Sequence, residues 1–262
     1  LLLERALQQN HSLTHVSIGW RHTHRSGLAR LLFAIAQCPN VRHLHLVLDD
    51  WIPDVVLNSL LQNLKDIECL HIQATHVLSK DENGHWCCSP TKPPASEAGV
   101  LVPRLRGLNM ERTPSSTCDH SVITKCVIRQ AHFYPRLKVL SLVDYDLTDS
   151  TVVSLADYLH ICGGISELSL RGNRKLTGHG LRMICHAPVM DKLDLSLCDL
   201  DPEDAIAVAD AVKVRPWPVG ELLLAGNHRI GSDGLKALTH KTFCQNVVSL
   251  DLSYTDAKDY RA

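Results

Sequence analysis

The chain has 262 residues, with 27 Lys and Arg against 28 Asp and Glu and a formal net charge of −1. This balance excludes the broad basic surface that nucleic acid or an anionic membrane would require, and the longest apolar run, residues 31–36, is far too short to span a membrane. Hydrophobic residues make up 45% of the chain and aromatic residues only 5%, so the core must be aliphatic.

The predicted elements alternate between helices and short aliphatic segments in chain order. A helix is expected over residues 2–9. Stripes of apolar residues at helical spacing then predict helices after Ser26, after Pro53, from Thr151 and after Asp201. The last start is the clearest, because Asp201 can cap the helix, Pro202 suits its first turn, and acidic residues follow near the positive helix end.

The aliphatic segments repeat a template, L-x-x-L-x-L, that predicts short buried strands. Nine segments fit it when other aliphatics are allowed, and they begin at residues 13, 41, 67, 105, 137, 165, 190, 219 and 247. Six of the eight start-to-start differences lie between 25 and 29 residues. Asn173, Cys198 and Asn227 each follow the last aliphatic by three residues. Such a side chain can bond the backbone groups that are freed where the strand turns away.

This strand–turn–helix period resembles the leucine-rich repeat family. The units of 28 to 29 residues with a full helix resemble its ribonuclease-inhibitor-like class, and Cys198 with the segment 177–181 resembles the cysteine-containing repeats of F-box proteins. The resemblance implies an α/β solenoid, a horseshoe with parallel strands on the concave face and helices on the convex face. We expect one domain of about nine repeats over residues 1–262, as a piece of a longer chain, with an irregular loop insertion at 79–100.

The residues between the inward aliphatics of each strand should point into the concave face. The early strands carry histidines there and the late strands carry carboxylates. We therefore predict a docking surface for a protein partner, the acidic end meeting a basic patch, whose contacts are His43, His45, His71, Glu167, Asp194, Glu221 and Asp251, with Trp86 on the loop insertion. The alternative is that this face is polar only because it is wet.

No motif predicts catalysis or a cofactor, so we expect a non-enzymatic protein. Histidines in flat rows do not suit tetrahedral zinc, and no metal site is predicted. His85, Cys87 and Cys88 flank Trp86 in a loop that could instead hold a soft metal or a redox pair. A further alternative is a substrate-receptor or regulatory region of a larger ubiquitin-ligase or GTPase-regulating protein.

The ten cysteines show no spacing typical of a disulfide scaffold, which predicts reduced thiols and an intracellular, cytoplasmic or nuclear, location. The sequence predicts no nucleic-acid or membrane partner. It gives neither the identity of the protein partner nor the oligomeric state.

Overall fold

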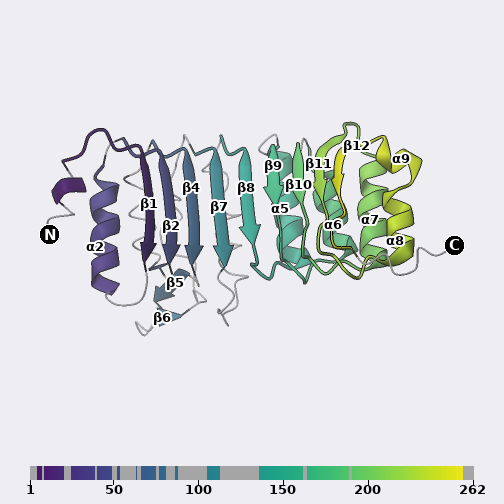
Figure 1. Cartoon of the computed structure of the whole chain (residues 1–262), viewed down its shortest axis with the longest axis horizontal. Helices are drawn as coiled ribbons and strands as arrows, with labels where there is room; N and C mark the ends of the chain where they lie inside the picture. Colours follow the sequence, from purple (N-terminus) through teal and green to yellow (C-terminus); the bar gives the residue numbers. More distant parts are fainter. Residues whose placement is uncertain are drawn as a thin grey trace. The chain divides into compact units, whose positions relative to one another are not determined.

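The computed structural model describes residues 5–7, 9–20, 25–38, 40–48, 52–53, 63, 66–74, 77–80, 86–87, 105–112, 136–161, 164–188 and 191–255. The chain divides into two compact units, residues 1–137 (unit 1) and 138–262 (unit 2), and each is described by itself. In both units parallel strands follow one another side by side in chain order (Figure 1).

Unit 1 contains four parallel strands and one described long helix. The strands are β1 (His15–Trp20), β2 (His43–Leu48), β4 (Cys69–Ala74) and β7 (Gly107–Arg112), paired in that order. The helix α2 (Arg25–Ala36) buries Leu32 and Ile35 completely. Strand residues alternate as a half-buried strand must, since Leu44 and Leu46 are buried whereas their neighbours are not. The predicted helix after Ser26 is confirmed, with its start at Arg25.

A second, smaller sheet of unit 1 contains β3 (Ile52–Pro53), β5 (Val77–Lys80) and β6 (Trp86–Cys87). β5 pairs parallel with β3 and antiparallel with β6. Part of the segment predicted as a loop insertion therefore forms two short strands. The rest of residues 79–100, most of the predicted helix after Pro53 and residues 113–135 lie outside the described residues.

Unit 2 repeats the predicted strand–turn–helix unit. Its parallel strands are β8 (Val139–Val143), β9 (Glu167–Ser169), β10 (Lys192–Asp194), β11 (Val219–Leu223) and β12 (Val247–Asp251). Its helices are α5 (Asp149–Ile161), α6 (Gly178–His186), α7 (Pro202–Lys213), α8 (Gly231–Leu238) and the short α9 (Lys241–Cys244). Figure 1 shows α5 to α8 following one another along unit 2, where each contacts the next.

The core of unit 2 lies between the inward face of the strands and the helices. Leu168, Leu193 and Leu222 occupy the same register position and are at most 1% exposed. Each such buried leucine stabilises the fold by about 1.5–3 kcal/mol. The predicted stripe of α5 is confirmed, because Val152, Leu155, Ala156 and Leu159 are all fully buried.

Acidic side chains cap the starts of α6 and α7. One cap comes from α7 and the residue before it, and the other reaches from α7 to the neighbouring helix α6. Asp201 accepts from the backbone N–H of Asp204 at 2.9 Å and the Asp204 carboxylate accepts from that of Asp201, so the expected start of α7 is a capping box. The other oxygen of Asp204 accepts from the N–H of Gly178 at 2.6 Å, at the start of α6. A Cβ on Gly178 would lie 2.9 Å from that of Ala207, so the close approach of these helices requires glycine there.

Two buried amides, those of Asn173 and Asn227, hold turns that follow strands of unit 2. The Nδ2 of Asn173 donates to the carbonyl oxygens of Leu142 and Leu170, and its Oδ1 accepts from the N–H groups of Tyr145 and Leu147. Asn173 thereby binds its own repeat and the preceding one. The predicted role of this position is confirmed.

The same position is filled in the next two repeats. Asn227 is fully buried and donates to the carbonyl oxygens of Leu195 and Leu224. Cys198, also buried, donates its thiol to the carbonyl oxygen of Leu170 at 3.3 Å. Burial raises the pKa of this thiol to about 12, so it stays protonated and remains a donor at neutral pH.

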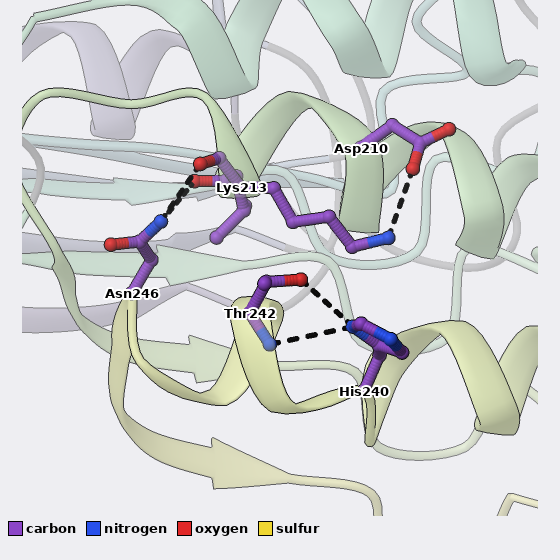
Figure 2. A network of polar contacts seen from close by, with 6 residues as sticks. Asp210, Lys213, His240, Thr242 and Asn246 are labelled. Carbon is purple, nitrogen blue, oxygen red and sulfur yellow. Dashed lines mark hydrogen bonds and ion pairs between the residues drawn. The ribbon is translucent and has the colours of Figure 1, made fainter.

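The last carbonyl groups of two helices also find donors in the following repeat. Arg215, only 8% exposed, donates to the carbonyl oxygens of Cys185 and Ala187 at the end of α6. Asn246 donates to those of Val212 and Lys213 at the end of α7, a contact that Figure 2 shows in part. Cationic and amide donors suit these positions because helix C-termini expose unpaired carbonyl groups and carry partial negative charge.

Replacement of Asn227 by Ala should lower the free energy of unfolding by about 2–4 kcal/mol, because two buried carbonyl groups lose their donor and the N–H of Leu200 loses its acceptor. Urea unfolding of the whole chain measures this loss. The exposed neighbour His228 provides the control, and His228→Ala should leave the midpoint nearly unchanged. Equal stability of the two variants would contradict the structural role of Asn227.

Candidate functional site

The candidate site is the sheet face opposite the buried leucines, called here the outer face. Within each unit the strand register confirms which residues share a row. In unit 2 one row contains Glu167, Lys192 and Glu221 on β9, β10 and β11, and the next contains Asp194 between Ser169 and Leu223. The predicted contact residues of unit 2 therefore lie on neighbouring strands of one face.

A lysine lies between two of the predicted carboxylates. The Nζ of Lys192 is 2.8 Å from Oε2 of Glu221, and both side chains are about two-fifths exposed. The hydrogen bond that Lys192 donates to Glu221, with further attraction from Glu221, Glu167 and Asp194, raises the pKa of Lys192. The outer face of unit 2 is thus acidic with one embedded cation.

Asp194 and Asp251 are oriented by hydrogen bonds. Oδ1 of Asp194 accepts from the N–H of Ser196 at 2.9 Å, and its Oδ2 accepts from the hydroxyl of Ser169 at 3.0 Å. Oδ1 of Asp251 accepts from the N–H of Ser253 at 2.8 Å. Bonds from the side chain and the backbone of Ser253 lower the pKa of Asp251, in that order of importance. The shared pattern Asp-x-Ser fixes both carboxylates at the point where their strands end.

The histidines of unit 1 lie in pairs across neighbouring strands. The rings of His15 and His43 stack at a centroid distance of 4.1 Å with only 9° between their planes, and those of His45 and His71 lie at 4.3 Å with 37°. Among the described residues, no group of three His, Cys, Asp or Glu side chains is placed to hold a metal.

His71 is the most perturbed histidine of this face. Its Nε2 is buried and has no hydrogen-bond partner. Burial, and then the neighbouring His45, lower its pKa below the ordinary value of 6.5. The ring therefore resists protonation in the folded chain.

The predicted loop residues are only partly described. Trp86 and Cys87 lie on β6, but their side chains fall outside the described part of the structure, as do His85 and Cys88 entirely. Among the cysteines whose side chains are described, Cys38, Cys69, Cys185, Cys198 and Cys244 are free thiols.

Sequence reasoning missed two exposed apolar residues beside the acidic row. Leu197 and Tyr254 are 38% and 82% exposed. Both stand two residues after the last leucine of the template, where other repeats have Gly172 and Gly226. A bulky residue at a repeat position that two other repeats fill with glycine could have identified both residues from the sequence.

Residues 186–209 match the model of a family described as Leucine Rich repeat. The matched segment contains β10 and most of α7, which is one complete strand–turn–helix unit of the kind described above. The fold is an α/β leucine-rich-repeat solenoid. No curated protein matches the chain. In the described part of the chain, every helix is too short or too polar to cross a bilayer.

The lowered pKa of His71 predicts weaker folding in mild acid. Below the ordinary value of 6.5 the unfolded chain takes up a proton that the folded ring resists, so stability falls as the pH falls through this value. Urea unfolding between about pH 7.5 and 5.5 should show a smaller loss for His71→Asn than for the wild type. His228→Asn, at an exposed turn, should keep the wild-type pH dependence; a His71→Asn profile identical to the wild type would contradict the assignment.

Proposed function

We propose that this protein is a non-enzymatic protein–protein interaction module that binds a basic partner through the outer face of unit 2. The observation that carries the proposal is the composition of two neighbouring rows. Across β8 to β12 these rows contain four carboxylates, Glu167, Asp194, Glu221 and Asp251, and one lysine, Lys192. Leucine-rich repeats in general mediate protein–protein interaction, which is consistent with this use of the face.

The charge of the face suits a partner with exposed Lys and Arg. Lys192 is the one cation in these two rows, and it is paired with Glu221. Glu167, Asp194 and Asp251 therefore have no second cation within the rows to pair with. A negative patch of this kind raises the association rate of a positive partner and selects against acidic ones. Strands about 4.8 Å apart place the carboxylates close enough to act on one partner surface.

The orientation of Asp194 and Asp251 lowers the entropic cost of binding. Each carboxylate is held by a backbone N–H two residues further on. A side chain that is already ordered loses little rotamer freedom when a partner binds. We infer that these two residues are the central contacts, and that Glu167 and Glu221 contribute mainly to steering.

We extend the proposal to the outer face of unit 1, where His43, His45 and His71 share neighbouring strands. These rings offer polar and aromatic contact area to a second part of a protein partner. Trp86 stays a predicted contact of the same partner. No residue of either face is proposed to act on a substrate.

We also propose that the repeats belong to the ribonuclease-inhibitor-like class. The supporting observation is a full helix after most described strands of unit 2, with lengths of 13, 9 and 12 residues for α5, α6 and α7. Cys198 in the place of Asn, together with the segment 177–181, favours the F-box-type alternative.

Removal of the four face carboxylates should abolish most partner binding. The variant combines Glu167→Gln, Asp194→Asn, Glu221→Gln and Asp251→Asn, which keep an oxygen to accept from Ser196 and Ser253. At about 0.5 kcal/mol per exposed charge pair, four pairs amount to about 2 kcal/mol, or roughly a thirtyfold loss of affinity. Quantitative mass spectrometry of proteins captured from a cell lysate, followed by titration of the captured protein, measures the effect.

A matched control removes the same four charges elsewhere. Asp157, Glu203, Asp210 and Asp233 are exposed on α5, α7 and α8, and their amide variants should retain wild-type capture. Equal capture by both quadruple variants, with unfolding showing both folded, would place binding away from the outer face of unit 2.

A further inference from the structure

The turns that follow the strands of unit 2 form a row of unusual backbone conformations. Two residues after the last template leucine, every repeat has a positive φ. The values are 59° for Asp144, 78° for Gly172, 59° for Leu197, 73° for Gly226 and 58° for Tyr254. The row continues the parallel ladder, because Leu197 donates to the carbonyl oxygen of Ala225 and Gly226 to that of Ser253. These residues therefore lie next to one another at the edge where the strands end.

Leucine and tyrosine are unfavourable in this conformation. A positive φ brings Cβ close to the backbone, so glycine adopts it freely and bulky residues do so under strain. Gly172 and Gly226 make the same turn without a side chain, so the turn itself does not need one. Nor does burial compensate for the strain, since Tyr254 is 82% exposed and Leu197 is 38% exposed. Strain of this kind concentrates at functional sites.

The outer face also has an apolar member, Leu223, which stands three residues before Gly226 of this row. Leu223 pairs in register with Asp194 on one side and Asp251 on the other. The Leu197 side chain lies over the glycine of the next repeat, because a Cβ on Gly226 would be only 2.4 Å from its Cδ2. Leu197 thus extends toward Tyr254 across a position that has no side chain. Leu197, Leu223 and Tyr254 thus lie on neighbouring strands of unit 2 or on the turns directly after them, together with the two oriented carboxylates.

We propose that Leu197, Leu223 and Tyr254 form an anchor patch that binds an extended peptide segment of a partner protein, in which an aliphatic or aromatic side chain is followed closely by Lys or Arg. The proposal rests on the proposed function of the outer face and specifies its partner. The apolar side chain of the peptide contacts the anchor patch, and its cation contacts Asp194 or Asp251.

The dimensions of the patch favour a short extended segment. Leu197 and Tyr254 are two strands apart, which corresponds to about 10 Å at about 4.8 Å per strand. An extended chain covers this distance with about three residues. Asp194 and Asp251 stand three residues before Leu197 and Tyr254, so apolar and cationic side chains within about three positions of each other can reach the patch and a carboxylate together. Asp194 and Asp251 supply the anionic site for the cation of the peptide, and their oxygens are already oriented by Ser196 and Ser253.

The test selects peptides on the whole chain from a display library of random 12-residue peptides. Peptides retained by the wild type are then bound to Leu197→Gly/Tyr254→Gly and to Leu223→Ser. The glycine variants introduce the residue that neighbouring repeats already have at this turn, so thermal unfolding should show no loss of stability. We expect retained peptides to combine Leu, Ile, Met, Phe, Tyr or Trp with Lys or Arg within three residues. Their affinity, from fluorescence anisotropy, should fall at least about tenfold in both variants, the effect of losing one well-packed anchor.

The matched control is Trp217→Ala/Val248→Ala. These apolar residues are 52% and 77% exposed but lie before or at the start of their strands, away from the anchor patch. Peptide affinity should be unchanged in this variant.

The outcomes separate the anchor patch from the proposed function. If Asp194→Asn/Asp251→Asn lowers the peptide affinity and the glycine and serine variants do not, the anchor patch is overturned and the acidic face remains supported. Peptides that lack Lys and Arg would overturn the stated partner chemistry. Selection of no peptide by the wild type would also overturn the anchor patch, whereas capture of a folded basic protein by the same chain would still support the outer face.

Discussion

Where a strand of unit 2 ends, its backbone must leave the sheet, and the polar groups it exposes are bound by a buried side chain of the following repeat. Asn173 and Asn227 do this with an amide, and Cys198 does it with a thiol. An unpaired buried carbonyl or N–H costs as much as a lost hydrogen bond, so the turn depends on this one side chain. Because the turn recurs in the same place, each new strand starts in register with the last.

That fixed register determines what the outer face can present. Residues between the inward leucines fall into straight rows, so a charged residue on one strand lies beside the residue at the same repeat position on the next strand. Lys192 is paired with Glu221 for this reason, and Leu223 lies between Asp194 and Asp251. The same register places Leu197 and Tyr254 in one line with Gly226 between them. The proposed contacts are therefore consequences of the repeat and not of separate loops.

The predictable part of this structure is the part governed by the period. The rows, the buried stripe of α5 and the capped start of α7 all follow from spacing and residue type, and the Asn and Cys positions follow from the turn.

The contacts that individual side chains make could not be predicted from the period. The rows make Lys192 a neighbour of both Glu167 and Glu221, but rotamers decide which one it contacts. The stacking of His15 on His43 similarly depends on ring orientation. The sequence shows that Leu197 and Tyr254 occupy these positions, but their backbone strain depends on a φ angle that the sequence does not give. The segment 79–100 has no period, so the repeat gave no basis for predicting its pairing.

The donors at the helix ends have a consequence for the order in which the chain can fold. Arg215 and Asn246 both reach back to carbonyl groups of the preceding repeat, and so do Asn173 and Asn227. During synthesis the earlier repeat leaves the ribosome first, with these acceptors still unpaired. Each repeat of unit 2 is completed only when the next has emerged, so the nascent chain always carries one unfinished repeat at its growing end.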